Sequence, residues 1–340
     1  MEEIRLYVPD LARIFWLTAL SFVIALIWTP LFTDFLYKNK LGKRIRDTGL
    51  DAKAAPIFYA LHKNKENTPT MGGLLIWITT AIITLLFNLS RAGTWLPLFA
   101  LVGAGIIGAI DDLANIRGIG PNRGGLAFKL KIFLYLLIAV VGAWWFYYKL
   151  EFNTLHLPGV GDLAIGFWYI PLFIIVLVSI GFAVNQTDGL DGLAGGTLAT
   201  AFGAYGVIAL VQGRIALAAF CGTIVGALMA FLWFNIYPAR FFMGDTGSMA
   251  LGITLGVIAF LTNSVVVLPI IGFIFTIEAL STIIQIVSKR FFKKKVFLSA
   301  PIHHHFEALG WPETKVTMRF WIISGAMAVI GLMIALIGRG

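Results

Sequence analysis

Charged side chains are scarce in this sequence, and cysteine is nearly absent. Asp, Glu, Lys and Arg make up only 13% of the 340 residues, about half of their share in a soluble domain. The single cysteine, Cys221, lies in an apolar run, so no disulfide can form within the chain and we expect it to serve packing. The start, MEEIRLYVPD, lacks the basic segment and cleavage site of a signal peptide. So little charge excludes an ordinary soluble domain.

Apolar residues are correspondingly abundant, at 59% of the chain with a mean hydropathy of +0.88. These values are typical of a protein that crosses the membrane several times. We therefore predict an all-α polytopic membrane protein that forms one integral-membrane domain over residues 1–340. About ten transmembrane helices are expected, at residues 11–32, 72–89, 95–110, 132–148, 165–184, 193–211, 215–236, 248–262, 265–287 and 318–337.

The positive charges indicate how these helices are oriented. Of the 26 Lys and Arg residues, 20 fall in alternate loops if the N-terminus is outside, which agrees with the excess of basic residues found in cytoplasmic loops. Both termini are then predicted to lie outside, and the net charge of +9 gives no reason to expect a nucleic-acid partner. The segment near residues 150–165 alternates apolar and polar residues around Pro158-Gly159, which predicts a short β-hairpin on the outer face.

Five aspartates fall at the predicted inner ends of helices, namely Asp111, Asp112, Asp188, Asp191 and Asp245. Ionisable groups beside membrane helices are costly and usually mark a site, although a solvated helix end or a helix cap would also explain each one alone. Carboxylates of this kind suit Mg²⁺. Asp245 begins a predicted helix, whose N-terminus can receive a phosphate or support a carboxylate.

Basic and imidazole side chains share this predicted inner face. Lys65 and Thr70 precede the second helix and Lys131 opens the fourth, where lysine can neutralise a pyrophosphate or simply belong to a surface charge run. The run His303, His304 and His305 follows the ninth helix. Three adjacent side chains diverge too far for a zinc site, so we expect one or two to touch substrate and another to hold the loop. Glu278, within the ninth helix, is expected to be a buried and paired glutamate at least as readily as a catalytic one.

Carboxylates, lysines and a surrounding membrane together indicate phosphoryl transfer to or from a lipid. An ion-coupled transporter would also place acids in membrane helices. Transporter sites, however, lie near the middle of the bilayer, whereas these acids gather at one face. The enzyme is therefore favoured, and a polyprenyl-phosphate carrier or other lipid-linked transporter is the alternative from another class.

Five sequence motifs resemble those of the phospho-N-acetylmuramoyl-pentapeptide-transferase family. They are PTMGG, the DD pair at a helix end, NQTDGLDGLAGG, FMGDTGS and APIHHHFEALGW, in the family's order and spacing from about residue 40 onwards. One departure is Asn67, which stands where the family usually has glycine. The resemblance implies a ten-helix, usually dimeric enzyme of the bacterial inner membrane. It further implies Mg²⁺-dependent transfer of phospho-MurNAc-pentapeptide from UDP to undecaprenyl phosphate, which yields lipid I and UMP.

The resemblance also implies roles for individual residues. The catalytic aspartates would be Asp111, Asp112 and Asp245, with Asp245 as the magnesium ligand. The substrate-binding residues would be Lys65, Thr70, Lys131, Asn185, Asp188, Asp191, Asn235, Phe242, Gln285, His303, His304 and His305. The active site would face the cytoplasm. Within the wider superfamily of polyprenyl-phosphate sugar-1-phosphate transferases, transfer of GlcNAc-1-phosphate from UDP-GlcNAc remains an alternative reaction, and the histidine run favours the muramoyl substrate through the resemblance only.

Overall fold

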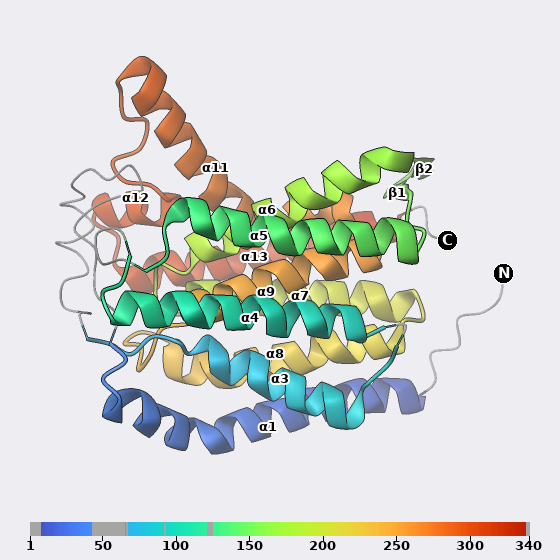
Figure 1. Ribbon diagram of the computed structural model, residues 1–340, viewed down its shortest axis with the longest axis horizontal. Coiled ribbons are helices and arrows are strands. Elements are labelled where there is room, and N and C mark those ends of the chain that lie inside the picture. Colours follow the sequence, from blue (N-terminus) through green and yellow to red (C-terminus); the bar gives the residue numbers. More distant parts are fainter. Residues whose placement is uncertain (1–7, 43–64, 66, 92, 121–124, 338–340) are drawn as a thin grey trace.

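The computed structural model describes residues 8–42, 65, 67–91, 93–120 and 125–337. Their long helices run roughly side by side as one bundle (Figure 1). In chain order the α-helices are α1 Val8–Lys38, α3 Gly73–Phe87, α4 Trp95–Ile116, α5 Phe128–Trp144, α6 Tyr169–Thr187, α7 Leu193–Val211, α8 Ile215–Asn235, α9 Gly244–Leu261, α10 Leu268–Ile271, α11 Phe273–Val287, α12 Ile302–Ala308 and α13 Glu313–Leu336.

The architecture confirms an all-α polytopic membrane protein. Among the described residues, eight helices are long and apolar enough to cross a membrane, and the bent segment formed by α10 and α11 gives a ninth. The apolar helix α3 is shorter, at 15 residues. Each of the ten predicted segments thus contains helix, while the count of ten crossings and the outside location of the termini stay predictions. The beginning of α1 and the end of α13 lie at the same end of the bundle (Figure 1), as an even number of crossings requires.

Helix α9 forms the centre of the bundle. Every residue of it is buried except Asp245, which is partly exposed, and it packs against α3, α4, α6 and α7. Within a lipid bilayer no hydrophobic effect drives helices together, so they associate through close van der Waals packing. Small residues permit this close packing. Where α3 meets α9, a Cβ atom on Gly73 would lie only 2.1 Å from the Cα atom of Gly247. The aspartate at the start of α9 is therefore attached to the most tightly held helix of the fold.

The predicted hairpin is present as β1 Thr154–Leu157 and β2 Gly161–Ala164, which pair in antiparallel register. Its His156 lies 2.8 Å from Asp162 across the hairpin, and the His156 backbone N–H donates to Asn263 in the turn after α9. The hairpin therefore closes the end of the bundle opposite α12 (Figure 1).

Residues 265–287, predicted as one continuous span, are bent sharply. A short 3₁₀ turn, Val265–Val267, leads into α10, and the chain then turns by 82° at Gly272 before α11 begins. Helix α11 consequently leaves the bundle at an angle and ends in a tip at the side of the molecule (Figure 1). The bend itself was not predicted, because an uninterrupted apolar run carries no information about direction, and glycine permits the turn.

Candidate functional site

The fold brings most of the sequence-predicted site residues to the end of the bundle where α4, α6 and α8 finish and α5 and α9 begin (Figure 1). This is the end where α12 also lies. Neighbouring helices run antiparallel, so the end of one helix lies beside the start of the next. Segments that are distant in sequence meet here for this reason. Three groups of contacts can be distinguished, centred on Lys131, on Lys65 and on the histidine run.

Asp112 caps the central helix. Its two carboxylate oxygens accept the backbone N–H groups of Asp245, at 3.1 Å, and Thr246, at 3.0 Å. The first N–H groups of a helix have no partner within the helix, and the helix dipole favours negative charge there. The predicted support of a carboxylate by this helix N-terminus is thus confirmed. The cap fixes the position of Asp245 relative to the end of α4.

Lys131 bridges two carboxylates. Its ammonium group contacts both Asp111 and Asp245, while the other oxygen of Asp245 accepts a hydrogen bond of 2.9 Å from the Asn185 amide. The second oxygen of Asp111 accepts the N–H of Leu126 at 2.6 Å. Four elements (α4, α5, α6 and α9) therefore meet in one group that carries both carboxylate and ammonium chemistry.

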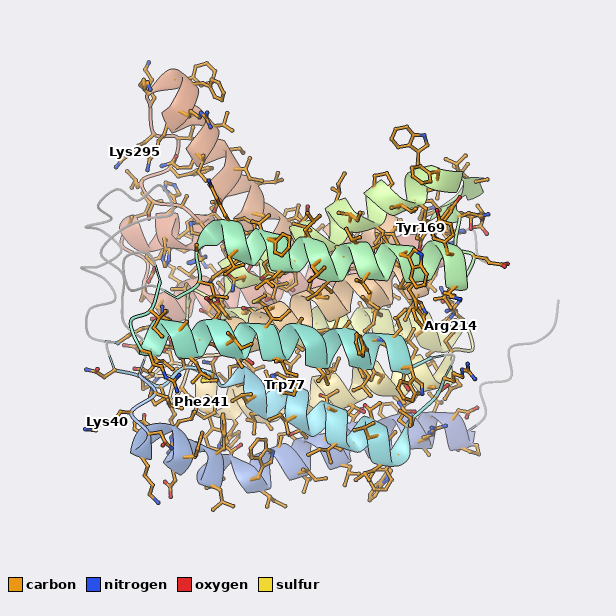
Figure 2. All side chains as sticks on the ribbon, viewed as in Figure 1. Lys40, Trp77, Tyr169, Arg214, Phe241 and Lys295 are labelled. Carbon is orange, nitrogen blue, oxygen red and sulfur yellow. The ribbon has the colours of Figure 1, made fainter. Side chains whose placement is uncertain are left out.

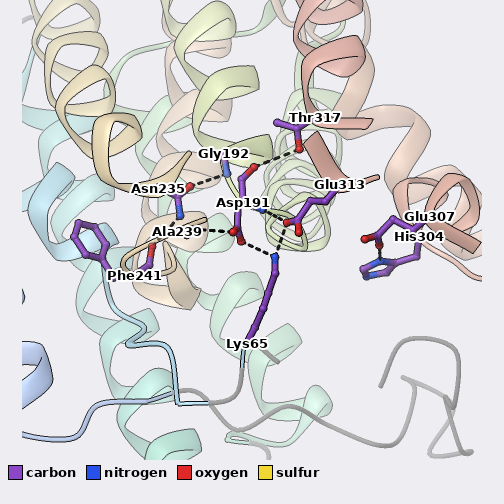
Figure 3. A network of polar contacts seen from close by, with 10 residues as sticks. All are labelled: Lys65, Asp191, Gly192, Asn235, Ala239, Phe241, His304, Glu307, Glu313 and Thr317. Carbon is purple, nitrogen blue, oxygen red and sulfur yellow. Dashed lines mark hydrogen bonds and ion pairs between the residues drawn. The ribbon is translucent and has the colours of Figure 1, made fainter. Parts of the chain in front are cut away.

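Lys65 forms the second group (Figure 3), with Nζ 2.7 Å from Asp191 and 2.5 Å from Glu313. The backbone N–H of Asp191 also donates to Glu313, at 2.6 Å. Burial alone would lower the pKa of Lys65, but the charges of Glu313 and Asp191 outweigh it and raise the pKa above its usual value. The ammonium form therefore persists at neutral pH and is aimed at this end of the bundle.

The loop that carries Asp191 is fixed by further hydrogen bonds (Figure 3). Asn235, at the end of α8, accepts the N–H of Gly192 at 2.9 Å and donates to the carbonyl of Phe241 at 2.8 Å. The same loop is linked to the start of α9, because the Asp188 carboxylate accepts the N–H of Gly244 at 3.1 Å. Asp191 contacts Lys65 and Asp245 contacts Lys131, so this hydrogen bond connects the two lysine groups.

Thr70 and Phe242 lie on two segments that are joined by backbone hydrogen bonds. The Phe242 N–H donates to the carbonyl of Pro69, and its own carbonyl accepts the N–H of Gly72, both at 2.8 Å. The Thr70 hydroxyl is buried and has no hydrogen-bond partner among the described residues. Asn67 adopts a φ of +70°, a conformation that glycine and asparagine tolerate best. Asparagine therefore fits this position with little strain.

The histidine run has divided roles. His303 is fully buried, with Nδ1 2.9 Å from Glu278, and His304 is nearly buried, with Nδ1 2.6 Å from Glu307. His305 accepts the backbone N–H of Leu298 at 3.2 Å. All three imidazoles thus make contacts within the chain, and His303 is the one fully enclosed by protein. Which of them touch substrate stays a prediction.

Gln285, predicted to bind substrate, has its side chain engaged in the loop after α11. Its amide donates to the carbonyl of Phe297 at 2.8 Å, and its oxygen accepts the N–H groups of Val296 and Phe297 at 3.0 Å each. Its described contacts stabilise this turn and include neither lysine group.

Two acidic residues of the network escaped the sequence reasoning. Glu313 follows Trp311-Pro312 at the start of α13, where a glutamate would be taken for an ordinary favourable charge in a first helical turn. Glu307 stands within the HHHFE motif, and its spacing of three residues from His304 could have indicated a pair on one helical face. The pKa of Glu307 is raised to about 7, mainly because burial disfavours the carboxylate, and the positive charge of His303 offsets only part of this effect.

The charges of these groups bear on which ion they can accept. Each lysine is shared by two carboxylates, so each group carries one excess negative charge when its members are ionised. An anionic diphosphate can approach only with additional positive charge. The described residues contain no ready group of three metal-ligating side chains, but Mg²⁺ commonly binds through one or two carboxylates plus substrate phosphates. The oxygen donors of Asp111 and Asp245 therefore fit this ion.

Comparison with known proteins identifies the family. The sequence model of Glycosyl transferase family 4 matches residues 94–263, and the phospho-N-acetylmuramoyl-pentapeptide-transferase signature 1 matches residues 65–76. The phospho-N-acetylmuramoyl-pentapeptide-transferase of Chloroflexus aurantiacus is 43% identical, covering 97% of this chain and 91% of its own length. The chain belongs to this transferase family.

Other members of the phospho-N-acetylmuramoyl-pentapeptide-transferase family are similarly close. The protein of a Geobacillus strain is 43% identical over 93% of this chain and 95% of its own length. That of Bacillus anthracis is 40% identical over 92% of this chain and 95% of its own. The similarity therefore spans the site as well as the bundle, and it confirms that the protein is a phosphotransferase enzyme.

Proposed function

We propose that this enzyme transfers phospho-MurNAc-pentapeptide from UDP-MurNAc-pentapeptide to undecaprenyl phosphate, releasing UMP and forming lipid I for peptidoglycan synthesis. Near-full-length similarity to proteins named phospho-N-acetylmuramoyl-pentapeptide-transferase supports the proposal. The observation that carries it is the contact of Lys131 with both Asp111 and Asp245, at the rim of a membrane-helix bundle. A lipid phosphate and a nucleotide-sugar can both reach such a position.

The proposed reaction is a single displacement. An oxygen of the lipid phosphate attacks the phosphorus that bears the sugar, and the bond from that phosphorus to the oxygen shared with UMP breaks. A phosphate monoester, with a second pKa of about 6, is largely dianionic at neutral pH, so removal of a proton from the nucleophile contributes little. Asp111 is accordingly assigned to positioning, since Leu126 and Lys131 hold its two oxygens.

The other residues have matching proposed roles. Lys131 and Lys65 would offer positive charge to the diphosphate, and Asn185 would orient Asp245 through its 2.9 Å hydrogen bond. Asp245, with Asp111 beside it, would hold Mg²⁺, which supplies charge neutralisation on the phosphoryl oxygens when bound. Asp112 would act by keeping the start of α9 in place. Thr70, whose buried hydroxyl lacks a partner among the described residues, would donate to substrate.

We further propose that the whole chain forms one catalytic domain in the bacterial inner membrane, with this site facing the cytoplasm, and that the enzyme works as a homodimer. The distribution of Lys and Arg supports the orientation. Labelling of an introduced cysteine at exposed Lys40 in intact cells and in inside-out vesicles tests it, because the only native cysteine is buried. Labelling in intact cells would contradict the orientation.

The substrate is tested by UMP release from purified protein with Mg²⁺ and undecaprenyl phosphate. UDP-MurNAc-pentapeptide and UDP-GlcNAc are supplied separately, and release is expected with the first only. Release with UDP-GlcNAc alone would contradict the proposed substrate. Asp245→Asn should abolish release in detergent, whereas a transporter would show no such turnover without a gradient. Stereochemistry at phosphorus tests the mechanism, since one displacement inverts configuration and a covalent aspartyl-phosphate route retains it.

A further inference from the structure

The segment that follows α11 carries a concentrated positive charge that the proposed reaction does not use. Five basic residues lie in a seven-residue stretch, and the sequence contains no Asp or Glu between Glu278 and Glu307. We call this segment the basic tip; its cations are Lys289, Arg290, Lys293, Lys294 and Lys295. Figure 2 labels Lys295 on the projection that α11 and the loop after it form outside the bundle.

The basic tip also exposes large apolar side chains. Phe291 is 71% exposed and Phe292 is 70% exposed, and Val296 and Leu298 are exposed as well. Helix α11, which precedes the tip, has one buried face and one exposed apolar face. Glu278 and Ser281 are among the buried residues, whereas Leu280, Ile283 and Ile284 are exposed. Aromatic and basic side chains mixed in this way are typical of segments that lie at a membrane interface.

The tip is a defined turn whose backbone is held in place. Gln285 holds the backbone of Val296 and Phe297, and the Ser288 hydroxyl donates to the carbonyl of Lys294 at 2.9 Å. Lys293 adopts a φ of +57° at the turn. These bonds hold three consecutive lysines next to the exposed phenylalanines. Because the segment is already ordered, binding a ligand there costs less conformational entropy.

The tip lies toward one end of the bundle rather than at its middle, which in a membrane would bring it near the lipid headgroups (Figure 1). The bend of 82° at Gly272 directs α11 sideways from the bundle, yet the tip lies toward the same end as α12 and the start of α5 (Figure 1). Apolar α11 side chains then face acyl chains, while the lysines reach the polar boundary. Basic residues at this boundary are attracted by the negative surface of the cytoplasmic leaflet.

We propose that the basic tip is a binding surface for anionic phospholipid headgroups, which it gathers beside the laterally projecting helix α11. Phe291 and Phe292 insert among the acyl chains, and Lys293, Lys294 and Lys295 pair with headgroup phosphates. Charge complementarity selects this occupant, because five cations without an intervening acid leave zwitterionic lipid at a disadvantage. The proposal does not depend on the transfer reaction, since it concerns lipid contact alone.

The experiment measures which lipid contacts residue 292. The full chain with Phe292→Cys is labelled with a fluorophore, and buried Cys221 is not expected to react. It is reconstituted into vesicles of four parts phosphatidylcholine and one part phosphatidylglycerol, with either lipid nitroxide-labelled near its glycerol. Quenching per labelled lipid should be about threefold greater for phosphatidylglycerol, reflecting attraction to the basic residues. A quenching ratio of one would overturn the proposal.

Two matched variants locate the effect. Lys293→Gln with Lys294→Gln and Lys295→Gln should bring the quenching ratio close to one. The same three-charge loss at exposed cations elsewhere at this end, Lys38→Gln with Lys40→Gln and Arg117→Gln, should leave it unchanged. A reporter at Trp168, which is exposed beside the hairpin, should give a ratio near one. Persistence of the preference in the tip variant would contradict the proposal.

A salt titration of the protein with all its native cations gives a second test that no folding defect can obscure. The Debye length falls from about 10 Å at 0.1 M salt to about 3 Å at 1 M. The phosphatidylglycerol preference at residue 292 should therefore decrease with salt. A preference that is insensitive to salt would show that charge is not its origin and would overturn the assignment.

Discussion

The Nδ1 atom of His303 lies 2.9 Å from a carboxylate oxygen of Glu278, and both side chains are fully buried. The pair joins α12 to α11, the helix that leaves the bundle. His303 also contacts the loop of the lysine network, because a Cβ atom on Gly189 would lie 2.3 Å from its Nε2 atom. This arrangement couples the position of α11 to the loop that carries Asp188 and Asp191.

Glu278→Ala is expected to destabilise the protein, since it leaves the fully buried imidazole of His303 without its hydrogen-bond partner. A buried polar group left without a partner typically costs about 1–3 kcal/mol. Thermal unfolding in detergent measures the effect, with Glu151→Ala, at an exposed glutamate beside the hairpin, as the control. Equal melting temperatures for the two variants would show that the pair contributes nothing.

Lys131→Gln is expected to reduce UMP release about 100-fold or more, which is typical when a charge-stabilising donor is removed from an active site. Lys129→Gln is the matched control, because Lys129 lies two residues earlier on the same helix and is exposed. The initial rate at saturating substrate is the measurement. A similar loss in both variants would argue for a general effect on α5.

Glu313→Gln tests the group around Lys65. The substitution removes one of the two carboxylates that hold the lysine, and hydrogen bonds to charged groups are worth enough for about a tenfold effect. We expect KM for the nucleotide-sugar to rise by that factor, with a smaller change in kcat. Asp34→Asn, at an exposed aspartate of α1, should change neither. A fall in kcat with an unchanged KM would place Glu313 elsewhere in the reaction.

Gly73→Ala is expected to disturb the contact of α3 with α9, because the added methyl group would lie 2.1 Å from the Cα atom of Gly247. Overpacking of this kind costs about 1–3 kcal/mol. Gly103→Ala is the control, since a Cβ atom there meets nothing within 4 Å among the described residues. Thermal unfolding should rank Gly73→Ala well below the parent protein and Gly103→Ala at or above it.

Glu307→Gln tests a pH dependence of stability. Burial raises the pKa of Glu307 in the folded protein to about 7 from an ordinary value of 4.5. The folded state therefore binds the proton more tightly, and this contribution to stability, complete below pH 4.5, is lost as the pH rises through 7. Melting temperatures between pH 5 and 8 should fall less steeply in Glu307→Gln than in the parent. Parallel curves would contradict the raised pKa.

Sequence alone was sufficient for the class of fold, because the apolar runs and scarce charge leave only a membrane bundle, and for the hairpin, because its pattern is local. It also placed Asp111, Asp112 and Asp245 at helix ends, since the apolar runs that mark the membrane-spanning segments end at these residues. The motifs that carry the family resemblance are likewise contiguous stretches of chain. These features depend on neighbours in sequence.

Only the tertiary structure decided how the acidic residues divide their work. Asp111 and Asp112 are adjacent, yet one contacts Lys131 and the other caps α9, because neighbouring side chains on a helix point about 100° apart. The pairing of Glu278 with His303, the part of Glu313 in holding Lys65 and the 82° turn before α11 likewise depend on contacts between distant segments. Hydrophobic periodicity fixes which residues face inward, but partners across the bundle are chosen by packing.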